Sequence, residues 1–90
     1  MRYLAEFYLP VRSGSIAALA RRARTAAAQA SRTGPPVRFI IAIHAPKDES
    51  CFVIYEAASP AAVNTAGALA GLMFDRVIGI TTYDAGGEAR

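Results

Sequence analysis

The fold is decided by residues 39–57, FIIAIHAPKDESCFVIYEA, which contain two apolar runs separated by a short polar segment. The two runs are mostly β-branched and aromatic, a composition typical of strands. The polar segment, PKDES at residues 46–50, contains proline and side chains that favour turns. The stretch therefore predicts a β-hairpin, with one strand over residues 37–45 and the returning strand over residues 51–57.

Two further strands and two helices are predicted on either side of this hairpin. A short run that alternates and is rich in aromatic residues predicts a first strand, and DRVIGITTY at residues 75–83 predicts a last one. Serine caps, apolar residues at helical spacing and a closing glycine predict the helices. The expected elements are a strand over 2–9, a helix over 13–31, a helix over 59–71 and a strand over 75–83.

The order strand-helix-strand-strand-helix-strand is that of a ferredoxin-like α+β sandwich. In this fold a four-stranded antiparallel sheet carries both helices on one face. We predict a single domain of this kind over residues 1–84 and a flexible tail over residues 85–90.

The composition predicts that a partner covers part of the surface. The chain has only 90 residues, so it can bury a modest fraction of its surface, yet 53% of its residues are hydrophobic. Residues 37–45 are apolar on both faces, although only one face of the sheet can meet the helices. We therefore expect a homodimer that forms through the open face or edge of the sheet.

Several classes of protein do not fit the sequence. A single cysteine excludes an internal disulfide and fits a reducing, cytoplasmic location. The longest uncharged run, residues 57–74, contains proline and glycine, so we expect no membrane span. FVIY at residues 52–55 matches the end of an RNA-binding strand motif but lacks the preceding basic residue and glycine. We expect no nucleic-acid partner.

Strand alternation predicts which polar side chains share a face. If the charged sets face away from the helices, one surface carries Glu6, Tyr8, Arg38, His44 and Glu56. This surface would be the floor of a cavity between two subunits. A mostly apolar floor with a few convergent polar groups suits a small organic ligand.

Glu6 is the most informative of these residues because a carboxylate inside an apolar strand needs a partner or water. One interpretation makes Glu6 a general base, with His44 as acid or orienting group and Tyr8 or Arg38 holding a substrate. That would be an isomerase or cyclase type of enzyme, for which no cofactor is expected. The other interpretation is an ion pair of Glu6 with Arg38 or Arg76.

The same surface also allows a metal site. Glu6, His44 and Glu56 are all potential ligands of a divalent ion. Two of these residues have a simpler interpretation: a solvated side chain at a strand end for His44, and a carboxylate near the N-terminus of the following helix for Glu56. Cys51 fits best as a small core residue.

Four stretches of the chain resemble a known group of proteins. These are YLAEFYLP at 3–10, VRFIIAI at 37–43, and CFVIYEAASPAAV with AGLMFDRVIGI at 51–63 and 70–80. They are similar to small actinobacterial ferredoxin-like proteins, largely of unknown function, that include a nickel-binding protein. The resemblance implies a homodimer, a nickel site or another divalent-metal site, and roles for Glu6, Tyr55 and Glu56. Ala66 stands where members of that group often carry histidine.

Three functions follow as alternatives. The first is a homodimer that binds a small molecule, with Tyr8, Arg38, Glu56 and Tyr55 as ligand-binding residues and Glu6 and His44 as the catalytic pair if a reaction occurs. The second is a divalent-metal-binding protein that uses Glu6, His44 and Glu56. The third is an interaction dimer without catalysis.

Overall fold

The computed structural model describes residues 1–10 and 14–86 of the chain. Its elements follow the predicted order and lie close to the predicted positions. In chain order they are β1 (Arg2–Tyr8), α1 (Ile16–Thr33), β2 (Val37–Ala45), the short 3₁₀ helix η2 (Pro46–Asp48), β3 (Ser50–Ala57), α2 (Pro60–Leu69) and β4 (Arg76–Ile80).

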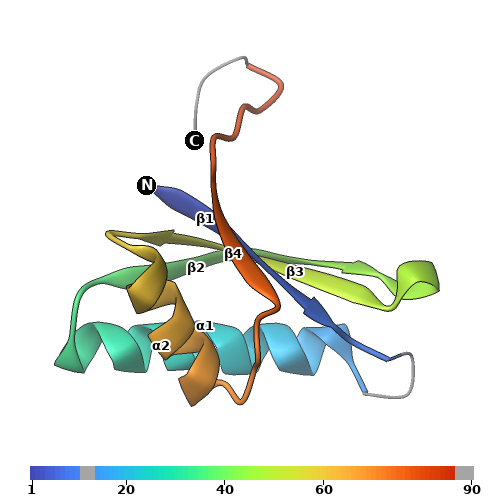
Figure 1. Cartoon of the computed structure of the whole chain (residues 1–90), viewed down its shortest axis with the longest axis horizontal. Helices are drawn as coiled ribbons and strands as arrows, with labels where there is room; N and C mark the ends of the chain where they lie inside the picture. The colour runs from blue at the N-terminus through green and yellow to red at the C-terminus, as the bar shows by residue number, and fades with distance from the viewer. Residues whose placement is uncertain (11–13, 87–90) are drawn as a thin grey trace.

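The four strands form one antiparallel sheet in the order β2-β3-β1-β4. Both helices lie on the same side of this sheet, and the opposite side carries no helix (Figure 1). The predicted ferredoxin-like α+β fold is therefore confirmed. None of the helices in the described part of the chain is long and apolar enough to cross a bilayer.

Both helices begin at a serine that satisfies backbone N–H groups of the first turn. The Ser15 hydroxyl accepts hydrogen bonds from the backbone nitrogens of Ala17 and Ala18. The Ser59 hydroxyl accepts one from the backbone nitrogen of Ala62. Such caps stabilise a helix because the first N–H groups have no partner within it. With Ser15 as its cap, the first helix begins at Ile16, slightly later than predicted.

The core lies between the sheet and the helices, and the helices contribute mainly small residues to it. β1 and β3 contribute every second side chain to the core. α1 contributes a row of alanines, which allows the helix to pack close to the sheet. The buried set includes Tyr3, Ala5, Phe7, Cys51, Val53, Tyr55, Ala23, Ala26, Ala27, Ala30, Val63 and Ala66. Cys51 is a core residue, as predicted, and burial raises the pKa of its thiol.

A bulge in β2 overturns one predicted face. The pairing of β2 with β3 shifts between Phe39 and Ile41, so one extra residue is inserted. Beyond this point Ile41 and Ile43 lie on the open face, opposite Ile54 and Phe52. His44 pairs with Cys51 and therefore lies on the helix face. The prediction that His44 shares a surface with Glu6 is wrong, because the extra residue reverses the alternation.

The last strand is shorter than predicted. β4 ends at Ile80, and residues 81–86 leave the body of the domain as an extended arm (Figure 1). The beginning of this arm is held by Arg2, whose Nη1 donates a hydrogen bond to Thr82 Oγ1 at 3.0 Å. Of the predicted tail, residues 87–90 lie outside the described residues.

Candidate functional site

The open face of the sheet is unusually apolar for a surface that meets no helix. The strand register places large apolar side chains from all four strands on this face: Leu4, Ile41, Ile43, Phe52, Ile54, Ile78 and Ile80. Ile41 is 48% exposed and Ile43 is 43% exposed. Isolated apolar residues on a surface are ordinary, but a contiguous patch of this kind marks an interaction or ligand site.

Glu6 lies on this face and already has a partner. Its carboxylate accepts a hydrogen bond from Arg76 Nε at 2.6 Å, across the pairing of β1 with β4. The ion-pair interpretation of Glu6 therefore describes the observed contact, with Arg76 as the partner. Tyr8, two residues further along β1, is 62% exposed, and its hydroxyl lies 3.4 Å from Glu49 Oε2.

Arg38, Glu56 and Arg2 form a second charged group on the open face. Arg38 Nη2 donates to Glu56 Oε1 at 2.9 Å, and Arg2 Nε lies 3.7 Å from Glu56 Oε2. The hydrogen bond and charge of Arg38, with a smaller contribution from the charge of Arg2, lower the pKa of the Glu56 carboxyl. Glu56 is thus held as a carboxylate between two guanidinium groups.

The Arg38→Gln substitution is expected to raise the pKa of Glu56 toward its ordinary value, because the largest cause of the lowering is removed. A carboxyl carbon titration by NMR measures this directly. Arg76→Gln is the matched control, since Arg76 contacts Glu6 and not Glu56. An unchanged Glu56 titration in Arg38→Gln would contradict the assignment of that contact.

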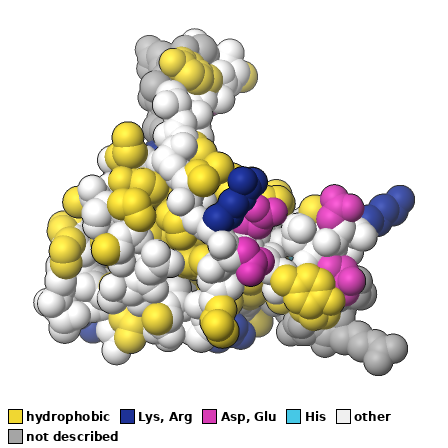
Figure 2. Space-filling view, viewed as in Figure 1, with side chains coloured by type: hydrophobic (Ala, Val, Ile, Leu, Met, Phe, Trp, Pro, Cys, Tyr) yellow, Lys and Arg dark blue, Asp and Glu magenta, His cyan; other side chains and the backbone are white. Residues whose placement is uncertain are grey.

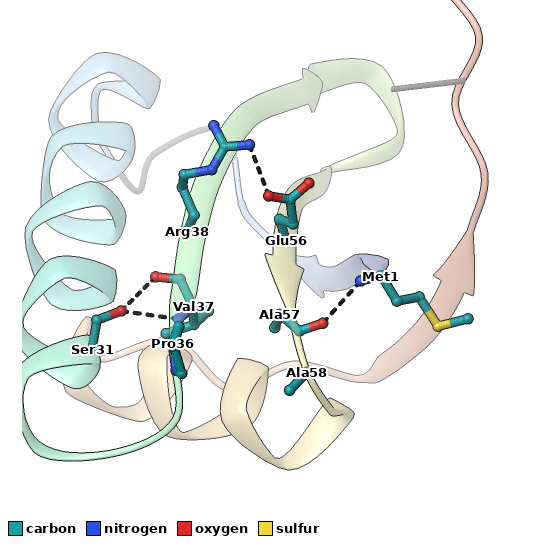
Figure 3. Close-up of a pocket in the computed structure, with 8 residues that line it drawn as sticks. All are labelled: Met1, Ser31, Pro36, Val37, Arg38, Glu56, Ala57 and Ala58. Atoms are coloured by element: carbon teal, nitrogen blue, oxygen red, sulfur yellow. Dashed lines mark hydrogen bonds and ion pairs between the residues drawn. The ribbon is translucent and has the colours of Figure 1, made fainter. Parts of the chain in front are cut away.

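A hollow opens beside this second charged group, where β2 begins and β3 ends (Figure 3). It has a volume of about 660 Å³ and is lined by Met1, Ser31, Pro36, Val37, Arg38, Glu56, Ala57 and Ala58. Ser31 Oγ accepts from the Val37 nitrogen at 2.9 Å and donates to the Val37 oxygen at 2.8 Å. These two bonds fasten the end of α1 to the start of β2 and so fix one wall of the hollow.

His44 is not brought to Glu6. It lies on the other side of the sheet, opposite Cys51, and its Nε2 is buried without a hydrogen-bond partner among the residues described. The proposed acid–base pair of Glu6 and His44 therefore does not form within one chain. The bulge in β2 is the physical reason for this separation.

Tyr55 lies inside the core and not on the open face. Its side chain is fully buried, with the rings of Phe39 and Phe74 at centroid distances of 6.4 Å and 6.1 Å. Burial raises the pKa of Tyr55 to about 12. Its hydroxyl has no hydrogen-bond partner among residues 1–10 and 14–86. In the single chain Tyr55 is a packing residue that a ligand on the open face cannot touch.

The Tyr55→Phe variant is expected to be more stable than the unmodified protein by about 1 kcal/mol, because it removes a buried hydroxyl that lacks a partner. Urea unfolding of both proteins measures the difference. Val63→Ala is a useful control, since it removes buried apolar atoms of the same core and is expected to destabilise. A loss of stability in Tyr55→Phe would show that the hydroxyl is hydrogen-bonded after all.

The three predicted metal ligands do not converge in one copy of the chain. His44 faces the helices, whereas Glu6 and Glu56 lie on the open face. Glu6 pairs with Phe52, four residues before Glu56, so the backbone positions of Glu6 and Glu56 are offset by about 13 Å along the strands. Within the described part of the chain no three His, Cys, Asp or Glu side chains are grouped for a metal ion. The donors do not fit a shared ion.

Sequence reasoning identified Arg38 and Glu56 but missed the hollow beside them and the outward position of Ile41 and Ile43. The sequence contains one sign of this: the strand of residues 37–45 is apolar on both faces, so its pattern does not specify which side chains face outward. Comparisons of the chain with family models, with curated proteins and with solved structures find no match.

Proposed function

We propose that the protein is a homodimer that forms through the open faces of two sheets and binds a small organic molecule there. One observation carries the proposal: seven large apolar side chains lie on a sheet face that no helix covers. Burying such a patch is favourable by about 25 cal/mol for each Å² of apolar surface removed from water. A second copy offers a matching patch of the same chemistry.

The charges on the open face also suit a second copy. At the end of the sheet where β1 begins, Arg2 and Arg38 outnumber Glu56. At the other end lie Asp48 and Glu49 of the turn, which outnumber Lys47, and Figure 2 shows acidic side chains gathered on the side where η2 lies. A two-fold axis in the interface and perpendicular to the strands would place each basic end near an acidic end. Such complementarity guides association and fixes its register.

The positions of the polar residues favour an organic ligand over a metal ion and over a Glu6–His44 acid–base pair. The metal donors lie apart, and Glu6 and His44 lie on opposite faces, so the proposal includes neither a shared metal ion nor that acid–base pair. What remains is an apolar surface with the Glu6–Arg76 and Arg38–Glu56 pairs set into it. Apolar walls with a few fixed polar groups are typical of small-molecule sites.

Native mass spectrometry, combined with fluorescence titration of the neutral apolar dye Nile red, tests the proposal. We expect a dimer at micromolar concentration and a saturable rise in dye fluorescence. A monomer would contradict the proposed interface. A dimer that leaves the dye unbound would contradict the ligand site and favour an interaction dimer. Addition of nickel, zinc and copper in the same spectra is expected to give no fixed uptake per dimer; a fixed uptake would favour the metal function.

A further inference from the structure

We infer that the ligand is an apolar organic acid, and that it lies in the hollow of Figure 3 with its carboxylate on Arg38. This inference rests on the proposed function, because it names the chemical class of the small molecule and its position at the margin of the open face. All the lining residues come from one chain, so the hollow exists in each copy.

The walls of the hollow suit an apolar body. Aliphatic atoms line it, from Met1, Pro36, Val37, Ala57 and Ala58. Figure 3 shows these residues around the start of β2 and the end of β3. A volume of about 660 Å³ is in the range of ordinary small-molecule pockets, about 300–1,000 Å³.

The polar groups of the walls are mostly engaged within the protein. The Ser31 hydroxyl is used twice, as acceptor and as donor, by the backbone of Val37. The Ala57 oxygen accepts from the Met1 nitrogen at 3.2 Å, and the Ala57 nitrogen donates to the Met1 oxygen at 2.9 Å. The part of a ligand that lies inside the hollow would therefore gain few hydrogen bonds if it were polar. An apolar part would have no hydrogen bonds with water to give up.

The rim supplies a positive charge for one anionic group. Arg38, which lines the hollow, and Arg2, which does not, both form an ion pair with the single carboxylate of Glu56. Arg38 is 63% exposed and uses Nη2 toward Glu56, while a guanidinium carries five N–H donors in all. A second carboxylate can therefore bind the same guanidinium without displacing Glu56. An ammonium group would meet the excess positive charge and is disfavoured.

Isothermal titration calorimetry with octanoate, octanol and octylamine tests the inference, with each probe kept below the concentration at which it aggregates. The three probes share an eight-carbon chain and differ in head group. We expect octanoate to bind at least 10-fold more tightly than octanol, and octylamine to bind most weakly. Equal binding of octanoate and octanol would overturn the role of Arg38, and tighter binding of octylamine would overturn the charge argument.

Variants then locate the site. Arg38→Gln is expected to weaken octanoate binding at least 10-fold, and Glu56→Gln to strengthen it several-fold, because it releases Arg38 from its partner. The Arg38→Gln, Glu56→Gln double variant keeps the hollow neutral at these two positions and is expected to bind octanoate no better than octanol. Arg76→Gln, which alters the other ion pair, is the control and is expected to change binding less than two-fold.

The outcomes separate this inference from the proposed function. A dimer that binds Nile red but shows no dependence of octanoate binding on Arg38 would overturn the hollow as the ligand site and leave the dimer standing. A monomer that binds octanoate through Arg38 would support the hollow and overturn the proposed dimer. Shifts of the Val37 and Ala57 amide signals on adding octanoate are expected, and their absence would count against the hollow.

Discussion

The Ile54→Lys variant is expected to be a monomer at concentrations where the unmodified protein forms the proposed dimer. Ile54 lies near the centre of the open face, directly opposite Leu4 on β1 and Ile41 on β2. In a sheet-to-sheet dimer each lysine ammonium would be buried among apolar side chains without a counter-charge, which costs several kcal/mol. We expect the dissociation constant of the dimer to rise 100-fold or more, which corresponds to about 3 kcal/mol.

Sedimentation equilibrium, or light scattering coupled to gel filtration, measures this change. The chain should still fold, because Ile54 is partly exposed in the single chain and a lysine there can reach water. Thr25→Lys on the exposed side of α1 is the matched control and is expected to remain dimeric. If Ile54→Lys stays a dimer with native circular dichroism, the open face is not the interface, and the edge strands become the place to look.

The Gly67→Ala variant is expected to lose about 2 kcal/mol of unfolding free energy. Gly67 is buried in α2, and a Cβ atom at this position would overlap the ring of Phe74. That ring is half-buried and packs against Phe7 and Tyr55, at centroid distances of 5.7 Å and 6.1 Å, so a shift of the ring would disturb these contacts. Overpacking of a core costs about 1–3 kcal/mol, which exceeds the helix propensity of at most about 1 kcal/mol that alanine gains over glycine.

Thermal unfolding should show the loss as a fall in melting temperature of about 10 °C for a domain of this size. The Gly67→Ala, Phe74→Leu double variant tests the cause, since a smaller side chain at 74 removes the overlap. Its loss of stability is expected to be smaller than the sum of the two single losses. Ala68→Gly, on the exposed side of the same helix, reports the propensity difference without the contact. A more stable Gly67→Ala protein would mean that the ring moves freely.

The first prediction depends on the open sheet face and the second on the contact of Gly67 with Phe74, and only the first of these features was predictable from the sequence. The open sheet face could be predicted, because an apolar strand in an antiparallel sheet with helices on one side must expose part of its apolar surface. The contact of Gly67 with Phe74 could not, because the two residues meet only when the chain after α2 returns across the helix. The glycine by itself was compatible with a helix and gave no sign of a neighbouring ring.

The sequence by itself determined the elements of this protein and their order. Local signals were sufficient: alternation in residues 2–9, the polar turn after residue 45, and serine caps at Ser15 and Ser59. Together these define a βαββαβ chain, and few ways of pairing its strands are compatible with short connections. They also placed Glu6, Tyr8, Arg38 and Glu56 on one face, because no bulge intervenes before those positions.

Only the tertiary structure decided where His44 lies, which arginine holds Glu6, and where the hollow forms. Each depends on distances between residues far apart in the chain. One extra residue in β2 reverses a face, and the register of β4 puts Arg76, not Arg38, beside Glu6. The hollow forms where α1, β2 and β3 meet. Alternative strand registers differ little in free energy. The packing of the whole core determines which register forms, and a local pattern of residues does not.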